Sequence, residues 1–127
     1  MNNFYRAIFS LSLVLALAAP SRADTTETPF KIDTKIAVGE KQIKFYYSEK
    51  EDALRAILYG IEPTKYQDSH YRFLVQVFTP EGTLLGESLG MCSKVQATQK
   101  VMLFKKIKAK DLSVANKFTL QISKCEK

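Results

Sequence analysis

Apolar and polar side chains alternate along much of the chain after residue 30, and this period of two predicts β-strands. The clearest strand is predicted from Tyr71 to Thr79, where the aromatic and β-branched residues fall on one face. The turn Pro80–Thr83 follows, with proline and glycine at positions that favour a tight turn. A further strand is predicted at 84–89, so these two segments form a hairpin.

Four other segments show the same alternation of apolar and polar residues, in full or in part. Strands are predicted over 30–38, 42–48 and 99–109, and a last strand is predicted from alternating apolar residues near the C-terminus. The inward residues of this last strand are Phe118, Leu120 and Ile122. Leu112 lies in the connection before it, where we expect an apolar side chain to close one end of the core.

Residues 52–61 fit two readings. Leu54, Ile57, Leu58 and Ile61 have the spacing of one helix face. The same residues also suit the second strand of a hairpin with 42–48, across the polar turn at 49–52. Periodicity does not separate a short helix from a strand, and we favour the strand because its surroundings are β.

Regularly spaced strands with turns between them predict a mainly β, antiparallel β-sandwich. This layout resembles the immunoglobulin-like sandwiches of many exported bacterial domains over about residues 30–125, although the chain has no Trp and Phe118 occupies the corner position. The resemblance implies architecture and not function. The length of 127 residues and the ordinary globular composition, 46% hydrophobic and 25% charged, fit one such domain over 30–127.

The first 23 residues have the order of a cleaved signal peptide of bacterial type. Arg6 precedes an apolar run of about 13 residues, too short for the ~20 that span a bilayer, and small residues precede the expected cleavage after Ala23. We therefore expect a periplasmic or secreted protein with no membrane span, and a flexible N-terminus at 24–29. Cleavage lowers the formal charge from +6 to +4, because Arg6 and Arg22 leave with the signal.

The two cysteines, Cys92 and Cys125, are expected to form a disulfide in an oxidising compartment. On the chain-entropy model, closing a loop of this length stabilises the fold by about 3–4 kcal/mol. The chain has no C-x-x-C motif and one histidine, so we predict no metal and no cofactor.

Catalytic motifs are missing from the sequence, and we predict that the protein is not an enzyme. His70 is the single histidine of the chain and the natural candidate for a general acid or base, but its neighbour Ser69 would point away from it on an extended chain. The acidic residues are scattered through turns, with no pair placed for acid and base chemistry.

The densest charge lies in the run 105–110. If 99–109 is a strand, Lys106, Lys108 and Lys110 project from one face about 6.5–7 Å apart and suit an anionic envelope polymer. A lysine-rich strand also protects a sheet edge from aggregation, or is simply a solvated face. Nucleic acid is excluded by the modest charge after cleavage and by the expected compartment.

Three tyrosines are candidates for a partner-binding surface: Tyr46, Tyr66 and Tyr71. Exposed tyrosines provide a large contact area at low entropic cost, although the same rings also serve to fill a core without Trp. The prediction is an exported, non-enzymatic domain that binds another exported or envelope protein, as a chaperone, an assembly or secretion accessory, or an enzyme inhibitor. Binding would use these tyrosines or strand addition at an exposed edge, and the alternative is an anionic polymer bound by the lysines.

Overall fold

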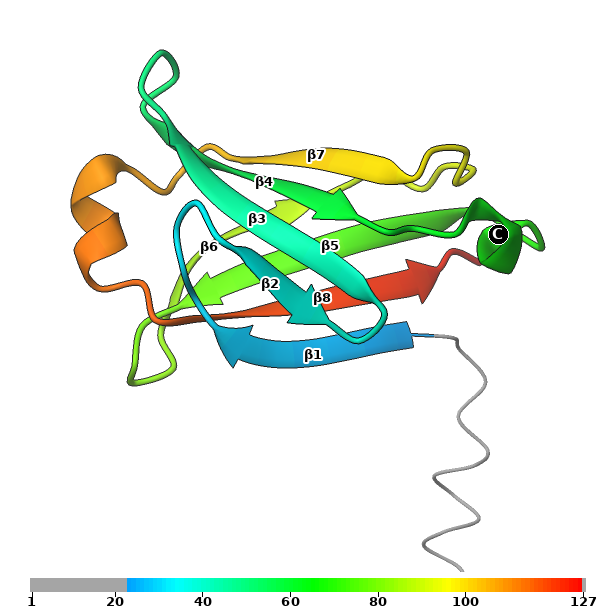
Figure 1. The fold of residues 1–127 in the computed structure, drawn as a ribbon, viewed down its shortest axis with the longest axis horizontal. Helices are drawn as coiled ribbons and strands as arrows, with labels where there is room; N and C mark the ends of the chain where they lie inside the picture. Colours follow the sequence, from blue (N-terminus) through cyan, green and yellow to red (C-terminus); the bar gives the residue numbers. More distant parts are fainter. Residues whose placement is uncertain (1–22, 127) are drawn as a thin grey trace, which may run out of the picture.

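The computed structural model describes residues 23–126 and shows two four-stranded antiparallel sheets packed face to face (Figure 1). The first sheet has the order β1 (Ala23–Pro29), β8 (Lys117–Lys124), β5 (Tyr71–Phe78), β6 (Leu84–Leu89). The second sheet has the order β2 (Lys35–Val38), β3 (Lys41–Ser48), β4 (Ala53–Tyr59), β7 (Gln99–Phe104). The predicted mainly β sandwich is confirmed.

The core lies between the sheets and follows the predicted alternation. Every second residue of β5 from Tyr71 to Val77 is buried, as are Phe118, Leu120 and Ile122 of β8. At the centre, the Phe45 ring lies 4.9 Å from the Phe118 ring. Such contacts between aromatic rings and buried apolar surface provide most of the driving force for folding.

Residues 53–59 are a strand, so the helical reading of 52–61 is wrong. β4 pairs with β3 on one side and with β7 on the other, which satisfies its backbone in the middle of the sheet. Leu54, Ala56 and Leu58 face the core, while Arg55 and Ile57 are half-buried on the outer face.

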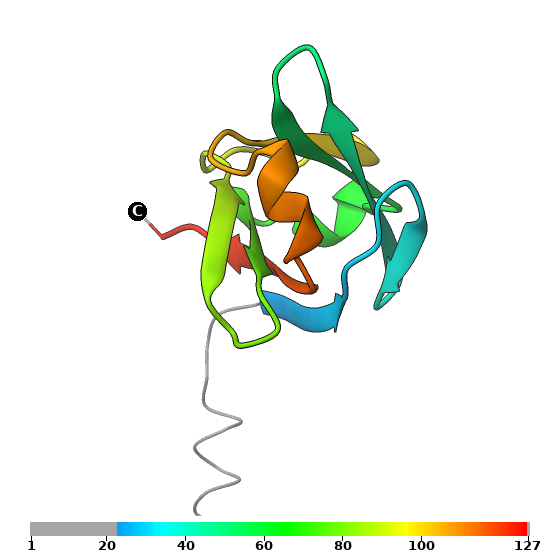
Figure 2. The ribbon, with the colours of Figure 1, turned by 90° about the vertical axis from the view of Figure 1, so that its left-hand side faces the viewer.

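Two short 3₁₀ helices close the ends of the sandwich: η1 (Pro63–Tyr66) and η2 (Ala109–Ser113). Figure 2 shows η2 lying across one open end, between the two sheets. Leu112 of η2 packs against the core, which confirms the expected apolar closure. Within the part of the chain that the structure describes, no helix has the length and apolarity needed to cross a membrane.

The expectation of a flexible N-terminus at 24–29 is wrong. These residues belong to β1, which pairs along its length with β8, and the Phe30 N–H donates to the Asn116 carbonyl at 2.7 Å. Edge pairing uses backbone groups and needs no apolar alternation, which explains why the polar sequence gave no signal. The predicted signal peptide lies outside the described residues, except for Ala23 at the start of β1.

Two predicted strands are shorter than expected. Of residues 30–38, only 35–38 form a strand, and Ile32 makes a single bridge to Phe45. The strand predicted at 99–109 ends at Phe104, where the chain turns. Ile107 is still fully buried, so its apolar side chain marked a core contact that a loop provides.

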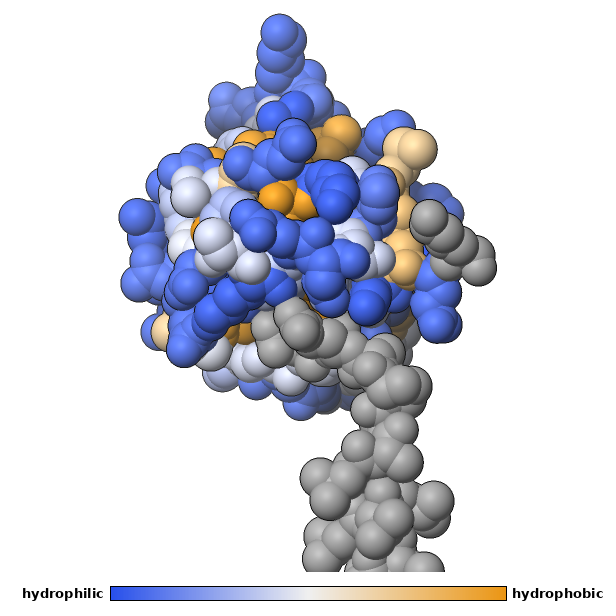
Figure 3. Space-filling view, turned by 90° about the vertical axis from the view of Figure 1, so that its right-hand side faces the viewer, coloured by the Kyte–Doolittle hydropathy of each residue, from blue (hydrophilic) through white to orange (hydrophobic). Residues whose placement is uncertain are grey.

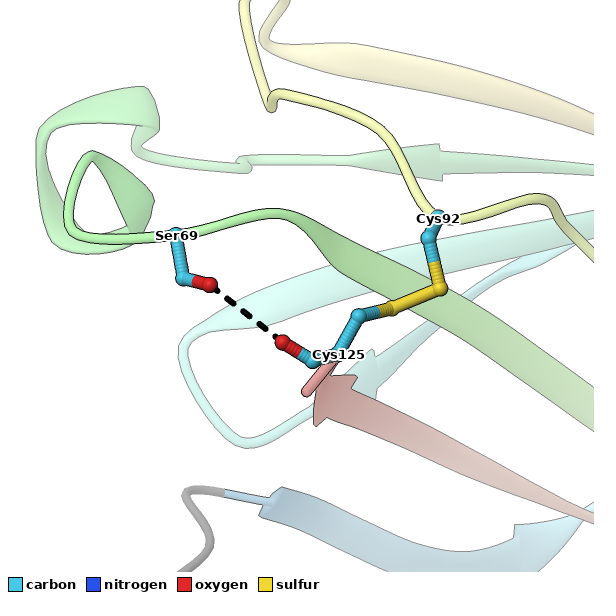
Figure 4. Close-up of a disulfide and its surroundings, with 3 residues drawn as sticks. All are labelled: Ser69, Cys92 and Cys125. Carbon is cyan, nitrogen blue, oxygen red and sulfur yellow. Dashed lines mark hydrogen bonds between the residues drawn. A yellow bond between two sulfur atoms is a disulfide. The ribbon is translucent and has the colours of Figure 1, made fainter. Parts of the chain in front are cut away.

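The disulfide between Cys92 and Cys125 is confirmed (Figure 4). It joins the segment after β6 to the end of β8, and the Cys125 N–H donates to the His70 carbonyl at 2.9 Å. The Ser69 hydroxyl donates to the Cys125 carbonyl at 3.4 Å. Figure 3 shows that the surface at the end of the molecule opposite η2 is mostly hydrophilic, with a few hydrophobic side chains between the polar ones.

Candidate binding surface

The three candidate tyrosines do not form one surface. Tyr66 and Tyr71 are 3% and 0% exposed, and their rings pack edge to face with centroids 5.0 Å apart. The Tyr71 hydroxyl donates to Asp68 at 2.8 Å, so its polar end is satisfied next to the loop that covers it. The prediction of a partner-binding role is therefore wrong for these two residues, because both rings are buried in the hydrophobic core.

Tyr46 is half-buried on the outer face of the second sheet, opposite Arg55 of β4. Arg55 is held by Glu51 through two hydrogen bonds of 2.6 and 2.7 Å. The same hydrogen bonds lower the pKa of Glu51. Tyr46 thus lies beside a paired arginine and is separated from the other two tyrosines.

The hairpin between β3 and β4 projects from the second sheet (Figures 1 and 2). At its base, the Tyr47 hydroxyl donates to Asp52, and this hydrogen bond raises the pKa of Tyr47 to about 12. The same bond lowers the pKa of Asp52. These contacts fix the shape of the hairpin and leave its tip as an ordinary polar turn.

The lysines do not project from one face of a strand, so that prediction is wrong. Lys106 lies in the turn after β7, Lys108 precedes η2 and Lys110 lies within η2. The Lys108 N–H donates to the Asp111 carboxylate at 3.0 Å, which helps to start the 3₁₀ helix. The strand ends early because Ile107 turns inward to the core and breaks the alternation that a strand would require.

His70 lies in the exposed loop before β5. Its neighbour Ser69 donates its hydroxyl to the Cys125 carbonyl, at 3.4 Å. Both residues thus lie beside the disulfide, where they help to join the end of β8 to the start of β5.

A groove of about 530 Å³ lies between β6 and the end of β7. One wall is β6 itself, and the other is formed by Leu103, Lys105 and Lys106. This volume lies in the range of pockets that hold ligands. The groove joins an edge strand of each sheet, and residues from both of the strands line it.

The two strands run in opposite directions across the groove. Gly86 of β6 lies against Ile107, and an added Cβ at Gly86 would lie 2.7 Å from Cγ1 of Ile107. At the other end, Gly90 lies against the side chain of Lys100, which is near the start of β7. Glycine at position 86 therefore permits the close approach of the segment that follows β7.

The hydrogen-bond register between β5 and β6 shows which backbone N–H and C=O groups of β6 point away from β5. The Gly90 N–H donates to the Phe73 carbonyl at 2.9 Å, and the β5–β6 ladder continues this register to Gly86. In an antiparallel pair, hydrogen-bonded positions alternate with positions whose backbone groups point away from the partner. Gly86 and Ser88 thus bond to β5, and Glu87 and Leu89 direct their N–H and C=O groups outward. No other part of the described chain forms a hydrogen bond with these outward groups.

The β6 edge is also less protected than the opposite edges. β1 ends at Pro29, and β2 has only four residues, which are features that discourage strand pairing. On β6, Leu84 and Leu89 are 45% and 52% exposed. Strand addition was predicted without a location, and the structure points to β6, where Leu84 and Leu89 are exposed and Gly86 and Ser88 provide small inward positions.

No protein-family model matches the chain, and no curated protein matches it. Among solved structures, the chain is similar to the Avr2 effector protein from the fungal plant pathogen Fusarium oxysporum, with 9% identity, a TM-score of 0.39, and 81% and 88% of the two chains covered. It is also similar to a carbohydrate-binding module of the β-sandwich superfamily, with 11% identity and a TM-score of 0.34, over 85% of this chain and 51% of that one.

Proposed function

We propose that the protein is an exported, non-enzymatic domain that binds an extended segment of another protein by strand addition at β6. The observation that carries the proposal is the set of outward backbone groups at Glu87 and Leu89, beside a groove of about 530 Å³. An added strand would pair with these groups and place alternate side chains in the groove. This mode of binding is compatible with a chaperone, an assembly or secretion accessory, or an enzyme inhibitor.

Burial of exposed apolar surface supports the same assignment. Leu84 and Leu89 are about half exposed, and full burial of a leucine stabilises by about 1.5–3 kcal/mol relative to full exposure. Covering the remaining surface of each would contribute about 1 kcal/mol, in addition to the backbone hydrogen bonds. The disulfide supports export, because such bonds persist in oxidising compartments.

The test is to replace Glu87 by proline in the tagged protein. Glu87→Pro removes an outward N–H and leaves the hydrogen bonds between β5 and β6 in place, because a proline is tolerated where the N–H faces solvent. Glu87→Ala is the matched control, since both variants lose the side-chain hydrogen bond with Gln76. Each protein is used to capture partners from an envelope extract of the source organism in ~1 M salt, where charge attraction is screened.

We expect the same protein to be retained by the wild type and by Glu87→Ala, and to be lost by Glu87→Pro. Circular dichroism confirms that all three remain folded. Equal retention by Glu87→Pro contradicts the proposal, as does the absence of a retained protein. Release of an anionic polymer at low salt would instead favour the exposed lysines at 105–110.

A further inference from the structure

The positive charge of the groove is concentrated at one end. Lys105 and Lys106 are exposed and line the groove. The next residue, Ile107, packs against Gly86, which places both lysines near the start of β6. The acidic residue that also lines the groove, Glu87, accepts a hydrogen bond of 2.9 Å from the Gln76 side chain.

This charge sets a direction for the added strand. A strand antiparallel to β6 begins near Leu89 and ends near Gly86, so its C-terminal end lies beside Lys105 and Lys106. A parallel strand would bring its N-terminal end to the same lysines, and a free α-amino group there would be repelled. Antiparallel pairing is also slightly more stable per residue.

The fold also limits how far the added strand continues. The segment after β7 crosses to β6 at Ile107, and η2 then lies across this end of the sandwich (Figure 2). An internal segment would have to turn away from β6 at this crossing. A segment that ends there needs no such turn, and its carboxylate would lie beside two ammonium groups.

We propose that the groove binds the free C-terminal segment of a partner protein, with the terminal carboxylate held by Lys105 and Lys106. This inference rests on the proposed strand addition. The carboxylate gains charge-assisted hydrogen bonds from the lysines, and these are stronger than neutral ones. Two inward positions of β6 hold the small residues Gly86 and Ser88, so the side chains of the added strand that face them are expected to be apolar and larger.

The test uses random peptides as the probe. One display library carries random heptapeptides with a free C-terminus, and a second carries the same random segment inside a longer chain. The best peptide is synthesised as the free acid and as the C-terminal amide, and its dissociation constant is measured by fluorescence anisotropy. The wild type is compared with Lys105→Met/Lys106→Met, and with Lys108→Met/Lys110→Met as the control of equal charge.

We expect the free-acid library to give the stronger binders, and the amide to bind the wild type about tenfold more weakly than the acid. In Lys105→Met/Lys106→Met, the acid loses about tenfold and no longer differs from the amide. In Lys108→Met/Lys110→Met, the tenfold difference remains, because these lysines lie outside the groove lining.

The outcomes separate this inference from the proposed function. Equal binding of acid and amide by the wild type, with both weakened by Glu87→Pro, overturns the C-terminal assignment and retains strand addition. Peptides that bind Glu87→Pro as well as the wild type, or no enriched peptide in either library, overturn both. A dimer in sedimentation that Glu87→Pro abolishes would assign the groove to a second copy of the chain, and would also overturn the inference.

Discussion

At the scale of single residues, Tyr71 supports the fold through its hydroxyl as well as its ring. The hydroxyl donates to Asp68, and the same carboxyl group accepts a hydrogen bond of 3.2 Å from Lys124. Asp68 thus ties the loop before β5 to the end of β8. Tyr71 is fully buried, so its contribution is to stability and not to a binding surface.

We predict that Tyr71→Phe lowers the free energy of unfolding by about 1 kcal/mol, because one partly buried hydrogen bond is lost. Urea denaturation measures this change. Binding at β6 should be unaffected, since no part of Tyr71 lines the groove. A folded Tyr71→Phe variant that no longer binds a partner would show that the ring takes part in binding.

The contribution of Asp68 depends on pH. The hydrogen bond from Tyr71, followed by that from Lys124, lowers the pKa of Asp68 below its ordinary value of about 3.9. A carboxyl group with a lowered pKa stabilises the fold above its pKa in the unfolded chain. This stabilisation is lost as the pH falls through the lower pKa of the folded state.

We therefore predict that Asp68→Asn lowers the urea midpoint at pH 6, and that its difference from the wild type shrinks as the pH falls below about 4. Urea midpoints measured between pH 7 and pH 2 provide the comparison. A difference that stays constant over this range would show that the charge of Asp68 does not contribute.

At the scale of elements, the approach of β6 to the segment after β7 defines the groove. Gly86 has no side chain, and Ile107 occupies the space that a Cβ would need. This contact holds the turn that carries Lys105 and Lys106. The position of the charged end of the groove thus depends on one glycine.

We predict that Gly86→Ala lowers the free energy of unfolding by about 1–3 kcal/mol, because the buried Ile107 side chain must shift. Ile107→Val in the wild type should cost about 0.5–1.5 kcal/mol, as for other such truncations. In the Gly86→Ala background, the same truncation should recover part of the loss. Additive effects in this double-mutant cycle would contradict the contact.

The sequence predicts elements well where burial imposes alternation. The alternation of Tyr71 to Val77 along β5, and of Phe118 to Ile122 along β8, correctly predicted both strands. β1 gave no such signal, because an edge strand of polar residues is held by its backbone pairing with β8. The end of β7 was misplaced because Ile107 is buried from a loop, and a buried residue in a loop has the same apolar character as one in a strand.

At the scale of the whole molecule, the disulfide joins two segments that follow strands of the first sheet. Cys92 follows β6 and Cys125 follows β8, with a sequence separation of 33 residues. We predict that Cys92→Ser/Cys125→Ser lowers the free energy of unfolding by about 3–4 kcal/mol, because the unfolded chain regains the entropy of this loop. Thermal unfolding followed by circular dichroism measures the loss.

The groove should survive this change at temperatures where the variant is folded, because neither cysteine is part of its lining. Partner binding by the folded Cys92→Ser/Cys125→Ser variant is therefore expected to equal that of the wild type. A loss of binding without unfolding would show that the disulfide also holds the β6 edge in place.

The groove itself was beyond the reach of sequence reasoning. It forms where β6 of the first sheet meets β7 of the second, and no local pattern states which edges of two sheets will be neighbours. Two separate parts were visible in the sequence, the strand predicted at 84–89 and the run of lysines at 105–110. Only the fold brings Leu89, Lys105 and Lys106 to one groove.

The most direct measurement is amide hydrogen exchange along β6, recorded by NMR with and without the enriched peptide. In the free protein, the amides of Gly86 and Ser88 should exchange slowly, and those of Glu87 and Leu89 rapidly, because only the first two bond to β5. Strand addition predicts that the peptide slows exchange at Glu87 and Leu89. A bound peptide that leaves both of these amides in rapid exchange would contradict binding at the β6 edge.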